Sequence, residues 1–344
     1  MRSFAAALVV LILWASLAHS QDHVPKTFSQ SDLDEVIAMV QDDTYDCRYD
    51  DALAGANKII RACPLEPQGY LYKCGVCWKM LEDGCVSSKD SAKQEIMALI
   101  DKAAGIANEE LQSDHSNVKA HFYYATSLLY RAGFAAVNHD WFSVLSDGGK
   151  AKQMLEKTIE LDSSFYDAYS GLGAFNYYSA RIPWYVKPVA LVLGVSGDKE
   201  KGIAELKMAL RYGNYSRTEA AVFLGSVVYV NDEDYADAIS MMSRLHSQYP
   251  DNVDFVRDLC HDNYELRNYV EVVRLADESL RIHNGFGPCH QESLCVIRFY
   301  RGKSYEKLNE KQKAIADFEI VVKVSGDHYS GREAKAALDK LRRQ

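Results

Sequence analysis

The sequence predicts an all-α solenoid, in which about six helical hairpins stack side by side and a C-terminal helix caps the stack. Small residues return in pairs at helix-length spacing, most clearly Gly302 with Ala314. Only 7 Pro and 20 Gly interrupt the 344 residues, which favours long helices joined by short turns. A hydrophobic content of 48% lets residues 31–344 bury one large core. We therefore expect a single repeat domain over that range.

The N-terminus has the composition of a secretory signal. An apolar run covers residues 4–15, and small residues stand at Ala18 and Ser20. This pattern predicts a cleaved signal peptide over residues 1–20, followed by an exported linker over residues 21–30. An uncleaved anchor is the alternative, but the run is shorter than the ~20 residues that a membrane helix needs. We expect an exported protein, periplasmic or extracellular, with no transmembrane segment after signal cleavage.

Each hairpin is expected to place one small residue in its first helix and another in its second, where the two helices cross. The first hairpin is predicted from about Ser31 to Cys63. The later pairs are Cys74 with Ala103, Ala125 with Ala151, Gly173 with Gly202, Gly225 with Ala238, Cys260 with Val272, and Gly302 with Ala314. A charged stretch from Gly331 to Arg343 is predicted to form the capping helix.

The spacing within a pair is much larger in hairpins two to four than in the last hairpin. The extra residues lie between the two small positions, so we expect expanded turns between the first and second helices of these hairpins. Those turns lie on the same edge of a stack. Insertions grouped on one face of a solenoid are often its binding face.

These spacings resemble the tetratricopeptide repeat (TPR). The stretch from Leu161 to Gly173 is close to the turn that joins consecutive TPR hairpins, and the resemblance extends over residues 31–325. Within it, Arg131 to Gly213 resembles a group of exported bacterial TPR proteins and, more faintly, the eukaryotic inclusion-body-clearance family. The resemblance implies a helical stack that presents a binding surface rather than a catalytic site.

The expansions are rich in aromatic side chains interleaved with polar ones. Interface cores have a similar composition, because Trp, Tyr and Arg carry much of the binding energy there. The alternative is that these side chains seal a wider helical core. The candidate binding residues are Phe134, Asn138, Trp141, Phe142, Arg181, Trp184, Tyr185 and Lys187.

Eight cysteines suggest disulfides in an exported chain. Antiparallel pairing of the second helix with the third places Cys47 opposite residue 83, so Cys47 with Cys85 is the favoured bridge. Cys289 with Cys295 is a weaker candidate, across a loop that leads into a helix. Pairing cannot be deduced from the number of cysteines, so other connectivities stay open.

No pattern of residues in the chain predicts catalysis. The sequence has no phosphate-binding loop, paired-histidine metal motif or dinucleotide fingerprint. Cys260-His261 and Cys289-His290 offer zinc-type ligands, but nothing in their spacing requires them to converge, so no metal site is predicted. A net charge of −9 argues against nucleic acid as a ligand.

The sequence therefore predicts a non-catalytic exported scaffold without a cofactor. It is expected to bind a protein or peptide partner through its repeat groove and its expanded edge. The alternative is a small-molecule or lipid carrier, whose pocket would be lined by the aromatic side chains of the expansions.

Overall fold

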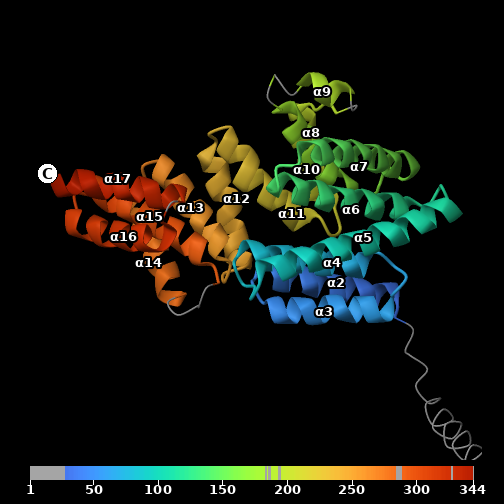
Figure 1. The fold of residues 1–344 in the computed structure, drawn as a ribbon, viewed down its shortest axis with the longest axis horizontal. Helices are drawn as coiled ribbons and strands as arrows, with labels where there is room; N and C mark the ends of the chain where they lie inside the picture. Colours follow the sequence, from blue (N-terminus) through green and yellow to red (C-terminus); the bar gives the residue numbers. More distant parts are fainter. Residues whose placement is uncertain are drawn as a thin grey trace, which may run out of the picture.

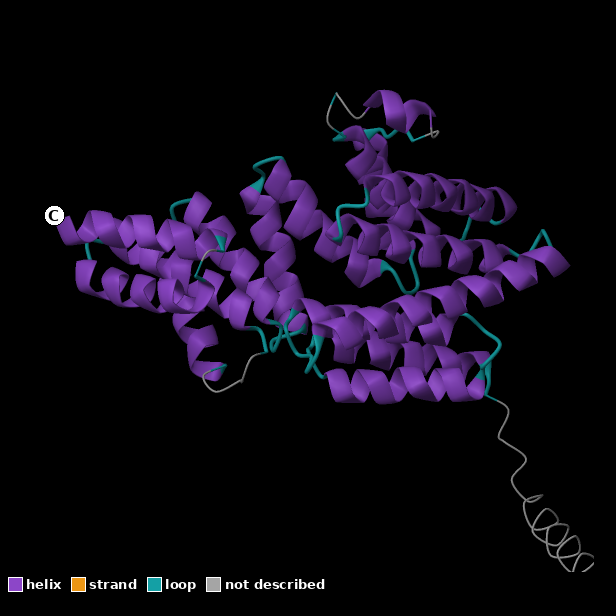
Figure 2. Ribbon diagram, viewed as in Figure 1, coloured by secondary structure: helices purple, strands orange, loops and turns teal. Residues whose placement is uncertain are grey.

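A computed structural model describes residues 28–182, 184, 187–192, 195–283, 289–326 and 328–343. The regular structure in these ranges is helical, with no strand among them (Figure 2). The predicted signal peptide, most of the predicted linker and Tyr185 lie outside the described residues.

The helices form consecutive antiparallel pairs along the chain (Figure 1). The described residues hold seven pairs, where about six were expected. The pairs are α2 (Gln30–Tyr45) with α3 (Tyr49–Ala62), α4 (Gln68–Glu82) with α5 (Lys89–Ser113), α6 (Val118–Val137) with α7 (Trp141–Leu161), α8 (Ala168–Ala180) with α10 (Lys199–Tyr212), α11 (Arg217–Phe223) and its π-helical continuation η1 (Leu224–Tyr229) with α12 (Tyr235–Gln248), α13 (Val253–Glu265) with α14 (Tyr269–Ile282), and α15 (Gln291–Lys307) with α16 (Lys311–Ser325). The capping helix is α17 (Tyr329–Arg343), close to its predicted bounds.

Side-chain caps mark where several helices begin. Ser29 accepts a hydrogen bond from the backbone N–H of Asp32, and the Asp32 carboxylate accepts one from the backbone of Ser29. Asn117 and Asp198 cap α6 and α10 in the same way, each accepting from an N–H three residues on. Such caps satisfy backbone donors that have no partner inside the helix.

The predicted small residues lie where the paired helices cross. A Cβ added to Gly173 would lie 2.7 Å from the carbonyl oxygen of Gly202, so α8 and α10 touch backbone to backbone. The Cys260 sulfur lies 4.0 Å from the carbonyl oxygen of Val272 on the facing helix. The all-α TPR-like solenoid is therefore confirmed at the level of individual crossings.

The extra length of hairpins two and three lies mainly in longer helices. Helix α5 has 25 residues, α6 has 20 and α7 has 21, and only residues 138–140 separate α6 from α7. No proline lies between residues 68 and 182, so nothing in the sequence stops these helices early. Hairpin four differs, because Pro183 and Pro188 fall in its connection, which holds the short helix α9 (Lys187–Val192).

The stack curls until its first hairpins meet helices from its second half (Figure 1). The Tyr215 hydroxyl donates to Asp34 at 2.5 Å, and the Tyr249 hydroxyl donates to Asp42 at 2.9 Å. The Asn252 side chain donates to the carbonyl oxygen of Tyr45 at 2.6 Å. Helices α2 to α13 therefore form a closed ring, and α14 to α17 extend from it.

One disulfide joins the two sides of this closure, and it corrects both predicted pairings. Cys85 is bonded to Cys289, with a Cα–Cα distance of 4.6 Å, while Cys47 and Cys295 are free thiols in the described structure. The expected Cys47–Cys85 and Cys289–Cys295 bridges were wrong because both were derived from segments that are neighbours along the chain. Ring closure brings together residues that are 204 positions apart.

Candidate functional site

The connections of hairpins three and four expose an unusual number of large apolar side chains. Trp141 is 59% exposed, Phe142 68% and Trp184 81%. Of the seventeen large hydrophobic side chains that are exposed in the described ranges, eight fall between residues 137 and 192. We call these eight the apolar edge: Val137, Trp141, Phe142, Tyr178, Trp184, Val189, Leu191 and Val192.

The two connections adjoin each other. Leu145 of α7, Phe175 of α8 and Ala190 of α9 share one small buried cluster. Leu145 lies one helical turn after Trp141, and Ala190 stands between two residues of the apolar edge. The α9 segment therefore packs beside the start of α7, so the exposed side chains of these two segments lie in one region of the surface.

The remaining predicted binding residues have more ordinary roles. Phe134 is half-buried, and its ring packs edge-on against Trp78 at 6.3 Å, which fits the packing alternative. The Asn138 side chain donates to the carbonyl oxygen of Phe134 at 2.8 Å and so closes α6. Arg181 is exposed and lies 5.5 Å over the ring of Tyr177.

Lys187 is exposed at the start of α9. Three of the predicted residues, Trp141, Phe142 and Trp184, therefore belong to the apolar edge.

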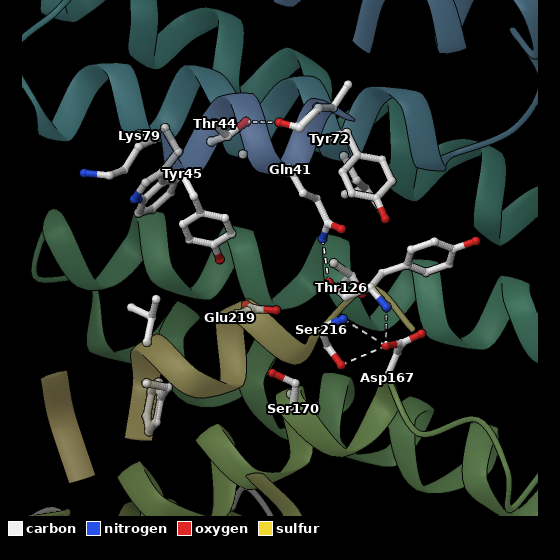
Figure 3. Close-up of a pocket in the computed structure, with 18 of the residues that line it drawn as sticks. Gln41, Thr44, Tyr45, Tyr72, Lys79, Thr126, Asp167, Ser170, Ser216 and Glu219 are labelled. Atoms are coloured by element: carbon white, nitrogen blue, oxygen red, sulfur yellow. Dashed lines mark hydrogen bonds between the residues drawn. The ribbon is translucent and has the colours of Figure 1, made fainter. Parts of the chain in front are cut away.

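A cavity of about 1330 Å³ occupies the centre of the ring. Its wall comes mainly from α2, α4, α6, α11 and α13, from the turn before α8 and the start of α8, and from the start of α15 (Figure 3). Gln41, Tyr45 and Tyr72 line one side, and Ser170 and Glu219 line the other. None of the predicted binding residues is among the described residues that line it, so the aromatic pocket expected for a carrier lies in a different place.

The cavity wall is aromatic and acidic. Its described residues include nine carboxylates but only three basic side chains. Two of these cations, Lys79 and Arg257, pair with carboxylates of the wall, chiefly Asp254. Burial raises the pKa of Tyr45 and Tyr130, so both phenols stay neutral and present hydroxyl groups to the interior.

Glu219 is the carboxylate at the middle of this wall. Its side chain is exposed, and because it lies inside the ring, that exposed surface faces the cavity (Figure 3). Burial within the ring raises the pKa of Glu219, the charge of Asp167 raises it further, and a hydrogen bond from Ser170 opposes both. Figure 3 shows Tyr45 and Glu219 pointing toward each other across the cavity.

Sequence reasoning missed the cavity because its wall is assembled from distant hairpins. Tyr72 on α4 and Glu219 on α11 both look like ordinary helix residues, and no local motif links them. The two Cys-His pairs do not come together: Cys260 is buried between α13 and α14, while His290 lies beside Asp83.

No helix in the described ranges is both long enough and apolar enough to span a membrane.

Several solved structures are similar in fold. The C-terminal part of a TPR repeat-containing protein from Cytophaga hutchinsonii is 12% identical, covers 87% of this chain and 98% of its own, and has a TM-score of 0.45. A tetratricopeptide repeat protein from Parabacteroides merdae is 14% identical, with coverage of 90% and 98% and a TM-score of 0.37. Yeast Tom70 is 10% identical, with coverage of 87% and 86% and a TM-score of 0.33.

No curated protein sequence matches the chain.

The family comparison is more specific. Residues 65–255 match the family described as "Regulator of microtubule dynamics protein 1-3", which is TPR-like. The match runs from the turn before α4 to the start of α13, and so includes the apolar edge and much of the cavity wall. Because it covers more than half of the 344 residues, the chain belongs to the regulator of microtubule dynamics protein 1-3 family.

Proposed function

We propose that this protein is a non-catalytic exported scaffold that binds a protein partner through the apolar edge. TPR-like folds generally mediate protein–protein interactions. The observation that carries the proposal is the exposure of the Trp141, Phe142 and Trp184 side chains. Exposed apolar patches of this kind are typical of interaction sites, and tryptophan is among the residues that contribute most to binding.

The ring closure favours the edge over the groove that the sequence also predicted. The inner face of the stack surrounds the cavity, and α2 is hydrogen-bonded to residues at the start of α11 and after α12. A partner helix would have to break these contacts before it lay along the inner face. The apolar edge is exposed without any such change.

The partner test compares single substitutions. Trp141→Ala and Trp184→Ala are expected to weaken binding by about 2 kcal/mol or more. Both should change the free energy of unfolding by less than about 1 kcal/mol, because the side chains are mostly exposed. Leu65→Ala is the matched control, since Leu65 is 78% exposed but lies on the turn before α4. Equal affinities for all four proteins would contradict the proposal.

The family's name suggests the first partner to test. It connects its members with the regulation of microtubule dynamics, so co-sedimentation with microtubules is the first binding assay for these variants.

Microtubules lie in the cytosol, whereas an exported chain would leave it. The intact mass of the protein from its own cells distinguishes a cytosolic chain from an exported one. Cleavage between Ser20 and Gln21 supports export, and a retained N-terminus contradicts it.

The central cavity supports a second candidate, a carrier of a small polar molecule. Its volume of about 1330 Å³ suits a sizeable ligand, and its tyrosines with Glu219 suit a polar or cationic group better than a lipid tail. Native mass spectrometry of the purified protein should then detect a bound small molecule, and Glu219→Gln should lose it. If no bound small molecule is detected and partner binding depends on Trp141 and Trp184, the scaffold function is favoured and the carrier function is not.

A further inference from the structure

A cluster of metal-binding side chains lies at the ring closure, outside the apolar edge. Ligand atoms of Cys47, Asp83 and His290 all lie within 4.8 Å of one another. We propose that these three residues bind one Zn²⁺ ion, which joins the first two hairpins of the ring to the start of α15. Thiolate, imidazole and carboxylate are the donors that Zn²⁺ takes in proteins, and three of them leave a fourth position for water.

The imidazole of His290 is the observation that points to a ligand. The side chain is 5% exposed, yet its Nδ1 accepts or donates no hydrogen bond within the described structure. The nearest carboxylate oxygen, of Asp83, is 3.3 Å away. Buried polar atoms are nearly always satisfied, so an unsatisfied Nδ1 beside a thiol and a carboxylate has the surroundings of a metal ligand.

The backbone already holds the three ligands close together. The N–H of His290 donates to the carbonyl oxygen of Asp83 at 2.7 Å. The disulfide between Cys85 and Cys289 ties the neighbouring residues of both ligands, and Cys47 follows the end of α2. In tetrahedral zinc sites the ligand atoms lie roughly 3.4 to 3.8 Å apart, so the largest separation in this cluster must shrink by about 1.0 to 1.4 Å. Side-chain rotation can supply a shift of that size.

The charges around the cluster favour a divalent cation. Three carboxylates, of Asp83, Asp254 and Asp258, face two cations, Lys79 and Arg257, in one connected ion network. The network is therefore one positive charge short. Zn²⁺ binding releases the Cys47 thiol proton to solvent and forms a bond to the thiolate, which adds one net positive charge and balances the network. No oxidation or reduction is involved.

Neighbouring side chains are placed to support the site. The Tyr49 hydroxyl donates to the Asp83 carboxylate, and the Tyr49 ring stacks on His290 with a centroid distance of 6.4 Å. Hydrogen bonds of this kind orient a ligating carboxylate. Lys79 pairs with Oδ1 of Asp83, while Oδ2, the oxygen nearest His290, accepts the Tyr49 hydroxyl. A carboxylate oxygen has two lone pairs, so Oδ2 can accept from Tyr49 and still coordinate the metal.

The test uses the full mature chain with its disulfide intact and Co²⁺ as a spectroscopic substitute for Zn²⁺. One equivalent of Co²⁺ should produce a thiolate-to-cobalt charge-transfer band, and Zn²⁺ should remove it. Cys47→Ser and His290→Asn should weaken binding at least 100-fold. Asn suits position 290 because its φ of 58° is left-handed, which Asn tolerates. Cys63→Ser, which removes another partly exposed free thiol, is the control and should bind as the parent does.

A second measurement needs no variant. Zn²⁺ should protect Cys47, and not Cys63, from alkylation in the unmodified chain. Absence of the charge-transfer band, equal alkylation of Cys47 with and without Zn²⁺, or unchanged binding in His290→Asn would each overturn the site. Binding seen only after reduction of the disulfide would also overturn it, because Cys85 and Cys289 would then be the ligands. Each result is independent of partner binding at the apolar edge.

Discussion

His246 lies half-buried on α12, and its Nδ1 makes no hydrogen bond to any residue that the structure describes. Burial lowers the pKa of His246, and the positive charge of Arg274 lowers it further, although Glu278 opposes this. The folded protein therefore holds a neutral imidazole, whereas the unfolded chain takes up a proton near pH ~6.5. The contribution of His246 to the free energy of unfolding is therefore fully present above that pH. It is lost as the pH falls through the lowered pKa of the folded state.

We expect the parent protein to lose more stability than His246→Leu between about pH 7.5 and about pH 5.5, because leucine removes the proton uptake on unfolding. Urea unfolding at the two pH values measures the difference. The control is His115→Gln, on the exposed turn before α6, which should behave as the parent does. A parent and a His246→Leu variant with the same pH dependence would show that this histidine is not held neutral.

At the scale of the elements, the helix crossings can be tested with two glycines. Gly173→Ala should destabilise the protein by about 1 to 3 kcal/mol or more, because its Cβ would meet backbone atoms of Gly202 and Leu206 at 2.7 and 2.8 Å. Gly105→Ala, in the middle of α5, should instead stabilise by about 0.5 to 1 kcal/mol, since a Cβ there contacts nothing within 4 Å. Thermal or urea unfolding measures both, and effects of the same sign would contradict these crossings.

The crossings were also the part of the fold that the sequence predicted best. A small residue such as Gly173 is needed wherever two backbones touch, so its spacing carries structural information. The position of the extra residues was harder to predict. The spacing between Ala125 and Ala151 gives the number of extra residues. It does not say whether these residues form a turn or lengthen the helices. The absence of proline in hairpins two and three was the available signal.

At the scale of the whole molecule, ring closure could not be predicted from local patterns. It depends on small rotations between successive hairpins that add up along the stack, and no short segment encodes their sum. The accumulated rotation brings distant residues into contact, such as Tyr249 with Asp42 and Cys85 with Cys289 in the disulfide. The apolar edge was partly predictable because it lies within two adjacent hairpins. The cavity and the Cys47–Asp83–His290 cluster were not.

Non-reducing peptide mapping should recover Cys85 linked to Cys289 in the oxidised protein. Cys85→Ser with Cys289→Ser should lower the free energy of unfolding by about 2 to 5 kcal/mol, because the bridge closes a very long loop of the unfolded chain. Cys63→Ser is the control, because it removes a free thiol that is not buried and leaves both the bridge and the core unchanged. A Cys47–Cys85 peptide would contradict the ring closure described above.

The proposed partner binds the apolar edge and not the interior of the ring. Hydrogen-exchange footprinting of the complex with that partner tests this placement. We predict slower exchange at residues 137–142 and 187–192, with the backbone around Gln41, Tyr72 and Glu219 unchanged. Protection confined to those cavity residues, with none along the apolar edge, would contradict binding at the apolar edge.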